Sequence, residues 1–109
     1  MQVLSKNIFE QINISNLKEE IIENIVNSDN IRIERIISFG HKSPNGFWYD
    51  QDENEFVIVL EGEATLEFDR NTLVSLKKGD YIIIEKHKKH RVISTAKDIL
   101  TIWLAIFYK

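Results

Sequence analysis

Short apolar runs separated by turn residues fill the chain from residue 31 to residue 108. β-Branched and aromatic residues are frequent in these runs, and such residues are enriched in strands. Glycine, asparagine and aspartate recur between the runs, which is typical of tight turns. Because no helical pattern falls between the runs, they favour an all-β antiparallel sandwich or barrel over a parallel sheet. We predict eight strands, at residues 31–38, 47–49, 55–61, 65–68, 72–76, 81–84, 91–95 and 99–108.

The segment before these runs has a different period. Its apolar residues recur at the spacing of one helical face, at positions 17, 21, 22, 25 and 26. Asn16, followed three residues later by Glu19, fits a capping box at the start of a helix. We therefore predict one short N-terminal helix over residues 16–27. The arm before it, residues 1–14, is expected to pack on the body or on a second subunit.

Composition and missing motifs exclude several classes of function. The 109 residues are 43% hydrophobic and 28% charged, which is ordinary for a globular domain. The net charge of −3 gives no reason to expect nucleic acid or an anionic membrane as a partner. The absence of cysteine excludes disulfides, thiol catalysis and thiolate metal sites. Nucleophile-elbow and phosphate-binding glycine motifs are also missing, which argues against serine hydrolases and nucleotide enzymes.

The chain also lacks the patterns that direct proteins into or across membranes. No apolar run reaches the roughly 18 residues that a membrane-spanning helix needs. The first six residues lack the apolar core of a signal peptide. We therefore expect a cytoplasmic protein.

Polar residues beside apolar strands are the candidates for chemistry. Glu55 precedes five consecutive apolar residues, where a carboxylate could bind a cation, accept a proton, pair with a base, or simply face water. His90 stands at the start of a strand and is the better candidate for a metal ligand. Lysines surround His87, so a solvated loop is the simpler interpretation there. Tyr49 and Gln51 are two residues apart and could face one cavity.

Two segments resemble motifs of the cupin family. Glu55 to Gly62, a Glu followed by six residues and a Gly, resembles the second half of cupin motif 1. Gly79 to His90 resembles cupin motif 2. The resemblance covers about residues 31–108 and is most specific to a subgroup of small bacterial single-domain cupins. It implies a single cupin domain over residues 1–109, with an arm and helix over 1–30 and a double-stranded jelly-roll barrel over 31–109.

The resemblance implies a metal site that this sequence only half retains. Cupins usually take two ligands from a His-x-His in motif 1, a third from the Glu and a fourth from the motif 2 His. Glu55 and His90 match the last two. The first two fall on Tyr49 and Gln51, or, if the loop is one residue longer, on Trp48 and Asp50. Neither register supplies an imidazole, so motif 1 is degenerate.

One function that the resemblance implies is a metal-dependent isomerase, lyase or oxygenase. The bound ion would be zinc, manganese, iron or nickel, all of which accept nitrogen and oxygen ligands. The ligands would be Glu55, His90, Gln51 and Asp50. The catalytic acid and base would be Tyr49 and His87, although His87 stands where the family motif has a Gly.

The alternative is a metal-free binding module for a small sugar-like ligand. Trp48 and Arg35 would then line the ligand pocket, while Glu55 and His90 would pair with each other or with Arg32 or Arg35. If a Glu55 oxygen and a His90 nitrogen each lie about 2 Å from a common point, the site holds an ion. If the two atoms instead form a direct hydrogen bond of about 2.8 Å, they are a plain pair. In either case the apolar strand at residues 99–108 and the arm favour a homodimer, because exposed apolar edges are otherwise a liability.

Overall fold

The computed structural model describes residues 3–10, 12, 18–69 and 71–109. The described chain contains eight strands and no helix. The strands are β1 (Ile21–Asn27), β2 (Ile31–Ser38), β3 (Asn54–Glu61), β4 (Glu63–Phe68), β5 (Thr72–Lys77), β6 (Tyr81–Ile84), β7 (His90–Thr95) and β8 (Thr101–Tyr108). Seven of them, β2 to β8, occupy predicted runs with boundaries shifted by at most two residues, so the all-β prediction is confirmed.

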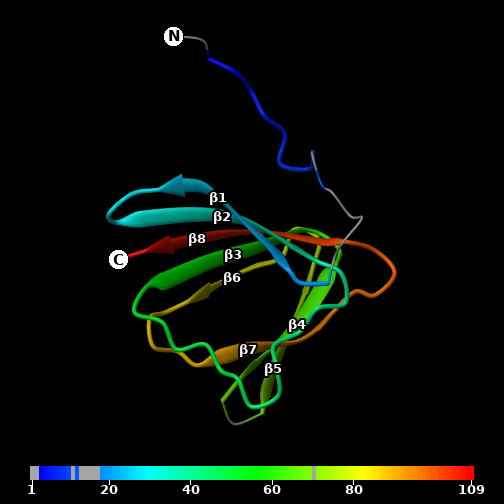
Figure 1. The fold of residues 1–109 in the computed structure, drawn as a ribbon. Helices are drawn as coiled ribbons and strands as arrows, with labels where there is room; N and C mark the ends of the chain where they lie inside the picture. The colour runs from blue at the N-terminus through cyan, green and yellow to red at the C-terminus, as the bar shows by residue number, and fades with distance from the viewer. Residues whose placement is uncertain (1–2, 11, 13–17, 70) are drawn as a thin grey trace.

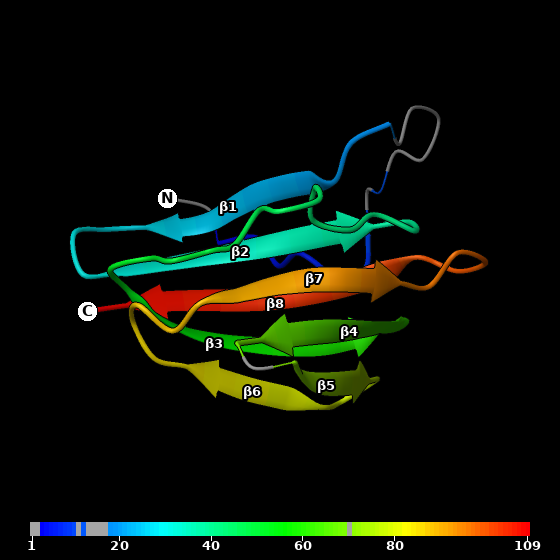
Figure 2. The ribbon, with the colours of Figure 1, turned by 90° about the horizontal axis from the view of Figure 1, so that it is seen from below.

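The strands form two antiparallel sheets that face each other across the barrel interior (Figure 1). The larger sheet has the order β1-β2-β8-β3-β6, and the smaller one has the order β5-β4-β7. Figure 2 shows the smaller sheet lying over the larger one. Because β8 lies between β2 and β3, the last strand of the chain occupies the centre of the larger sheet. Residues far apart in sequence therefore meet in the interior.

Alternate residues of the central strands point into the space between the sheets. The buried positions of β3 are Glu55, Val57 and Val59, while the residues between them are only half-buried on the outer face. One apolar cluster fills the interior, and its largest members are Leu66, Phe68, Ile84, Trp103 and Phe107. Glu55 thus stands at the end of an apolar row. Its carboxylate needs a polar partner there, because burying an unpaired charge is costly.

The predicted N-terminal helix is wrong. Residues 16 and 17 lie outside the described residues, and Ile21–Asn27 forms strand β1, which pairs antiparallel with β2. Its β-branched residues suit a strand, and a bulge between Asn24 and Val26 absorbs the mismatch between their spacing and a strand's period of two. The open edge of β2 supplies the tertiary pairing that overrides the helical pattern. No described residue belongs to a helix long and apolar enough to cross a membrane.

Two other segments differ from, or go beyond, the sequence prediction. Residues 47–49 form no strand, and only one bridge, between Tyr49 and His90, joins this segment to β7. In the arm, the beginning of the described chain extends away from the barrel (Figure 1), whereas Ile8 and Glu10 lie against the larger sheet. Arg35 fastens the arm, because its guanidinium donates to the carbonyls of Ile8 and Glu10 at 3.0 and 2.6 Å. The rest of the arm, residues 1, 2, 11, 13 and 14, lies outside the described residues.

Candidate functional site

A cavity of about 290 Å³ opens between the two sheets. Its floor is apolar and is built mainly by Val57, Leu66, Ile84, Trp103 and Phe107. Its polar lining residues are Glu20, Arg32, Glu34, Tyr49, Gln51, Glu55 and His90. The volume lies near the lower end of the range of about 300–1,000 Å³ for small-molecule sites. An apolar floor with a few convergent polar groups is typical of such sites.

Glu55 and His90 meet at one side of this cavity. Glu55 points inward from β3, and His90 is the first residue of β7, a strand of the opposite sheet. Glu55 Oε1 lies 3.6 Å from His90 Nε2, and both side chains are about nine-tenths buried. Gln51 Nε2 donates to the same carboxylate oxygen at 2.9 Å. The distance of 3.6 Å is too long for a direct hydrogen bond, so both groups keep hydrogen-bonding capacity toward the cavity.

The environment of His90 favours its protonated form. Burial lowers its pKa, but the contact with Glu55 and the hydrogen bond to the Lys88 carbonyl outweigh that effect and raise the pKa above its ordinary value. The carbonyl lies 2.9 Å from Nδ1, and a carbonyl only accepts, so Nδ1 carries a proton. Nε2 is therefore the ring nitrogen that faces Glu55 and the cavity.

Tyr49 is held against His90 by both its backbone and its ring. The two residues exchange backbone hydrogen bonds of 2.7 and 3.1 Å. Their rings stack with centroids 5.3 Å apart and an interplanar angle of 23°. Burial, followed by the charges of Glu20 and Glu55, raises the pKa of the Tyr49 phenol. The hydroxyl therefore stays protonated near neutral pH and can donate a hydrogen bond to a ligand.

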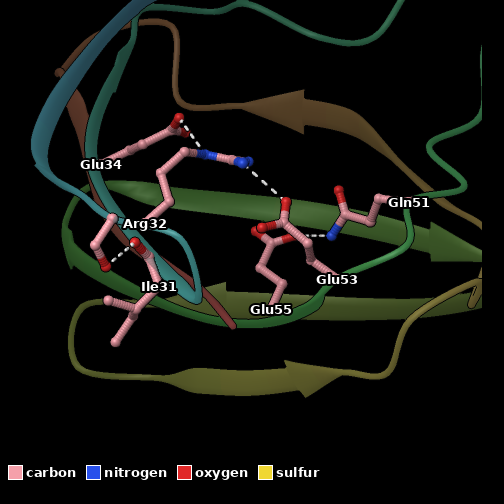
Figure 3. A network of polar contacts seen from close by, with 7 residues as sticks. Ile31, Arg32, Glu34, Gln51, Glu53 and Glu55 are labelled. Carbon is pink, nitrogen blue, oxygen red and sulfur yellow. Dashed lines mark hydrogen bonds and ion pairs between the residues drawn. The ribbon is translucent and has the colours of Figure 1, made fainter. Parts of the chain in front are cut away.

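Arg32 and its two carboxylate partners form the other polar wall (Figure 3). Arg32 Nε donates to Glu34 at 3.0 Å, and one of its terminal nitrogens donates to Glu53 at 2.8 Å. The guanidinium also lies 4.1 Å from the centroid of the Phe107 ring. Although burial opposes the charge, the contacts with Glu53 and Glu34 raise the Arg32 pKa. Arg32 is thus a fixed cation between two anions.

The sequence prediction named Arg32 only as a possible partner of Glu55 or His90, and it did not place Glu34 in the cavity. A signal was present, because the two residues alternate with Ile31 and Ile33 along β2 and so share one face. That alternation did not show which face points inward. Only the position of β2 beside β8 decides this, and it depends on pairing across the whole chain.

Four of the eight predicted site residues lie elsewhere. Asp50 and His87 pair with each other at 2.9 Å, and both are exposed on the surface outside the cavity. Trp48 lies against the Arg91 guanidinium, 5.6 Å from ring centroid to carbon, and does not line the cavity. Arg35 points to the outer face of the larger sheet, where Glu23 and the arm surround it.

The other four residues, Tyr49, Gln51, Glu55 and His90, line one cavity. Of the two registers that the sequence left open, this arrangement favours the one with Tyr49 and Gln51, because neither Trp48 nor Asp50 lines the cavity.

These residues do not fit a resident transition metal. Only Glu55 and His90 carry strong donors, because Gln51 turns its amide nitrogen toward Glu55 and Tyr49 presents its ring face to His90. The separation of 3.6 Å between Glu55 Oε1 and His90 Nε2 is too long for the plain hydrogen bond, and it is compatible with two atoms that each lie about 2 Å from a common point, so the case against a metal rests on the number of donors and not on this distance. Among the described residues, no group of three or more His, Cys, Asp or Glu is placed to hold a metal.

Several solved structures have a similar fold. A Ralstonia eutropha JMP134 protein described as a putative mannose-6-phosphate isomerase is 32% identical, with 98% of this chain and 99% of that one covered and a TM-score of 0.92. An RmlC-like cupin from Desulfovibrio desulfuricans is 18% identical, with 97% of each chain covered and a TM-score of 0.73. A polyketide cyclase from Streptomyces resistomycificus is also 18% identical, with 84% of this chain and 66% of that one covered and a TM-score of 0.70.

The jelly-roll prediction is confirmed by these folds, which include a cupin with a double-stranded β-helix from Methanocaldococcus jannaschii. Among curated proteins, no sequence matches this chain. The cupin domain family matches residues 40–107, which is more than half of the chain. The match covers both the strand that carries Glu55 and the strand that carries His90. The chain therefore belongs to the cupin family.

Proposed function

We propose that this cupin binds a small polar molecule in the barrel cavity and does so without a resident metal. The observation that most supports this proposal is the position of Glu55 and His90, which face each other at 3.6 Å beside an apolar floor. Both side chains can still form a hydrogen bond with a third group. Gln51 holds the carboxylate, and the Tyr49 hydroxyl supplies a further donor. A ligand with hydroxyl or amino groups would complete these contacts.

A panel of neutral sugars, polyols and small amines, assayed by thermal shift, tests this function. A ligand that binds only the folded state raises the melting temperature by mass action. We expect Gln51→Leu to abolish the shift, because Glu55 loses the donor that holds it. Asn45→Ala, at an exposed loop position, is the matched control and should keep the shift. Equal responses of the two variants would overturn the proposal.

An enzymatic role is a second candidate, which a single observation favours. The contacts of His90 raise its pKa, so a protonated imidazole beside a carboxylate faces the cavity. Such a pair can give a proton to a ligand and take one back. Exchange of ligand C–H protons with deuterium from the solvent, followed by NMR, would detect this chemistry. His90→Gln should stop the exchange, and persistence of the exchange would exclude His90 as the acid.

We also propose that the protein is a homodimer formed through the outer face of the larger sheet. The register places one apolar row across all five strands, made of Val26, Ile33, Ile106, Phe56 and Ile83. Ile83 is 55% exposed and Val26 is 41% exposed. A contiguous apolar face of this kind is typical of an interaction surface.

A second copy is the occupant that we favour, because the beginning of the arm extends away from its own barrel and exposes apolar side chains such as Val3 and Leu4 (Figure 1). An arm of this shape can cross to a partner related by two-fold symmetry. Sedimentation at micromolar concentration should give twice the chain mass, and Ile83→Asp should give a monomer. A monomeric wild-type protein would refute the dimer.

A further inference from the structure

The cavity holds more negative than positive charge. The carboxylates of Glu20, Glu34 and Glu55 line it, against the guanidinium of Arg32 and the imidazole of His90. Glu53 adds a fourth carboxylate from the side, through its bond to Arg32. Even with His90 protonated, the carboxylates are in excess.

Neither cation is available to an anionic ligand without competition. Arg32 is held between two carboxylates at 2.8 and 3.0 Å and packs on the Phe107 ring. His90 directs Nδ1 to a backbone carbonyl and Nε2 to Glu55. A phosphate that approached either cation would also approach a carboxylate. Repulsion between like charges of this kind is costly where an apolar floor excludes water.

Glu20 is the anion that lacks a cationic partner within the described part of the chain. Its Oε2 accepts a hydrogen bond of 2.5 Å from the Ser38 hydroxyl, and the same hydroxyl accepts the Trp103 indole N–H at 3.2 Å. This relay fixes the carboxylate beside the floor of the cavity. A fixed carboxylate beside an apolar aromatic wall suits an ammonium group.

We propose that the cavity selects a small polar ligand carrying an ammonium group, prefers it to the uncharged analogue and rejects the phosphorylated or carboxylated analogue. This inference rests on the proposed binding function and names its ligand class. The description of the Ralstonia neighbour names a sugar phosphate as the ligand. A sugar phosphate is a dianion, so we expect the cavity of this chain to reject it.

The two tryptophans give a built-in readout for this selectivity. Trp103 lines the cavity, whereas Trp48 lies outside it against Arg91, so their indole N–H signals in a ¹⁵N-labelled sample report binding and its control. The probes are two matched sets: mannose, mannosamine and mannose 6-phosphate, and cyclohexanol, cyclohexylamine and cyclohexanecarboxylate. We expect the amine of each set to shift the Trp103 signal with the lowest Kd, roughly fivefold below that of the alcohol. The anion should give no saturable shift.

Glu20→Gln should remove most of the preference for the amine and leave the binding of the alcohol in place. Glu19→Gln is the matched control, because it makes the same charge change at the neighbouring, exposed position. Anions that bind as well as amines, or a preference that survives Glu20→Gln, would overturn the inference while leaving the binding function intact. If no probe moves the Trp103 signal, the binding function itself fails and the inference fails with it.

Discussion

The glycine between β3 and β4 is the position where one added methyl group should cost most. Gly62 has φ = +84°, and a Cβ there would lie 2.5 Å from Thr101 Oγ1, 2.6 Å from the Leu100 carbonyl oxygen and 2.7 Å from Thr101 Cα. Two of these three atoms belong to the backbone at the start of β8, the central strand of the larger sheet. The clash therefore cannot be relieved by turning a side chain.

The expected loss follows from two separate contributions. A left-handed conformation costs an alanine roughly 1–2 kcal/mol. Displacing the backbone of β8 adds to this, so Gly62→Ala should lower the free energy of unfolding by at least ~3 kcal/mol. Gly79→Ala isolates the first contribution, because Gly79 has φ = +89° and no atom lies within 4 Å of its added Cβ.

Urea and thermal denaturation of the two variants provide the assay. In a domain of this size, ~1 kcal/mol corresponds to a shift of roughly 4–8 °C in Tm. Gly79→Ala should therefore melt about 4–16 °C below the wild type, and Gly62→Ala should melt much lower still or fail to fold. Equal losses in the two variants would refute the claim that β8 packs directly against the turn after β3.

Two further predictions concern the histidines. Since the folded protein raises the pKa of His90, the stability from its protonation is fully present below the unfolded pKa of about 6.5 and is lost as pH rises through the folded pKa. The stability advantage of the wild type over Glu55→Gln, measured by urea denaturation, should thus be larger at pH 5.5 than at pH 9; equal advantages would exclude the pair. His87 has φ = +63°, so His87→Gly should relieve up to ~1 kcal/mol of backbone strain despite losing the exposed contact with Asp50. A rise in Tm with unchanged ligand binding would agree with this, and lost ligand binding would place His87 in the site.

His87 also shows how far the resemblance to cupin motif 2 predicts the structure. The family motif has a Gly where this chain has His87, and the backbone there takes the left-handed conformation that a Gly adopts freely. The sequence predicts a catalytic role for His87 because imidazole is a natural acid or base. The backbone instead turns its ring to the surface, where Asp50 pairs with it. Residue type alone could not predict that direction.

The fold was predictable where local pattern and tertiary context agree. The seven strands from β2 to β8 combine β-branched residues with turn residues between them, and both favour the same structure. At β1, local pattern and tertiary context disagree. The isoleucines there have helical spacing, but pairing with the open edge of β2 holds them in a strand. A short apolar segment does not carry enough local preference to resist such pairing.

The candidate site was only half predictable for a related reason. Glu55 and His90 followed from the motifs, and Tyr49 and Gln51 followed from counting along the chain to them. Arg32 is in the cavity because β2 pairs with β8, which in turn pairs with β3. No local pattern encodes a pairing over that separation.

Elemental analysis of the untagged protein, purified without chelators, tests the central claim most directly. The comparison is between the wild type and Glu55→Ala, each also incubated with manganese, iron, nickel or zinc. Because no group of three or more His, Cys, Asp or Glu among the described residues is placed to hold a metal, we predict far less than one equivalent of tightly held metal in either protein. Close to one equivalent in the wild type, lost in Glu55→Ala, would contradict the account and make this protein a metal-dependent cupin.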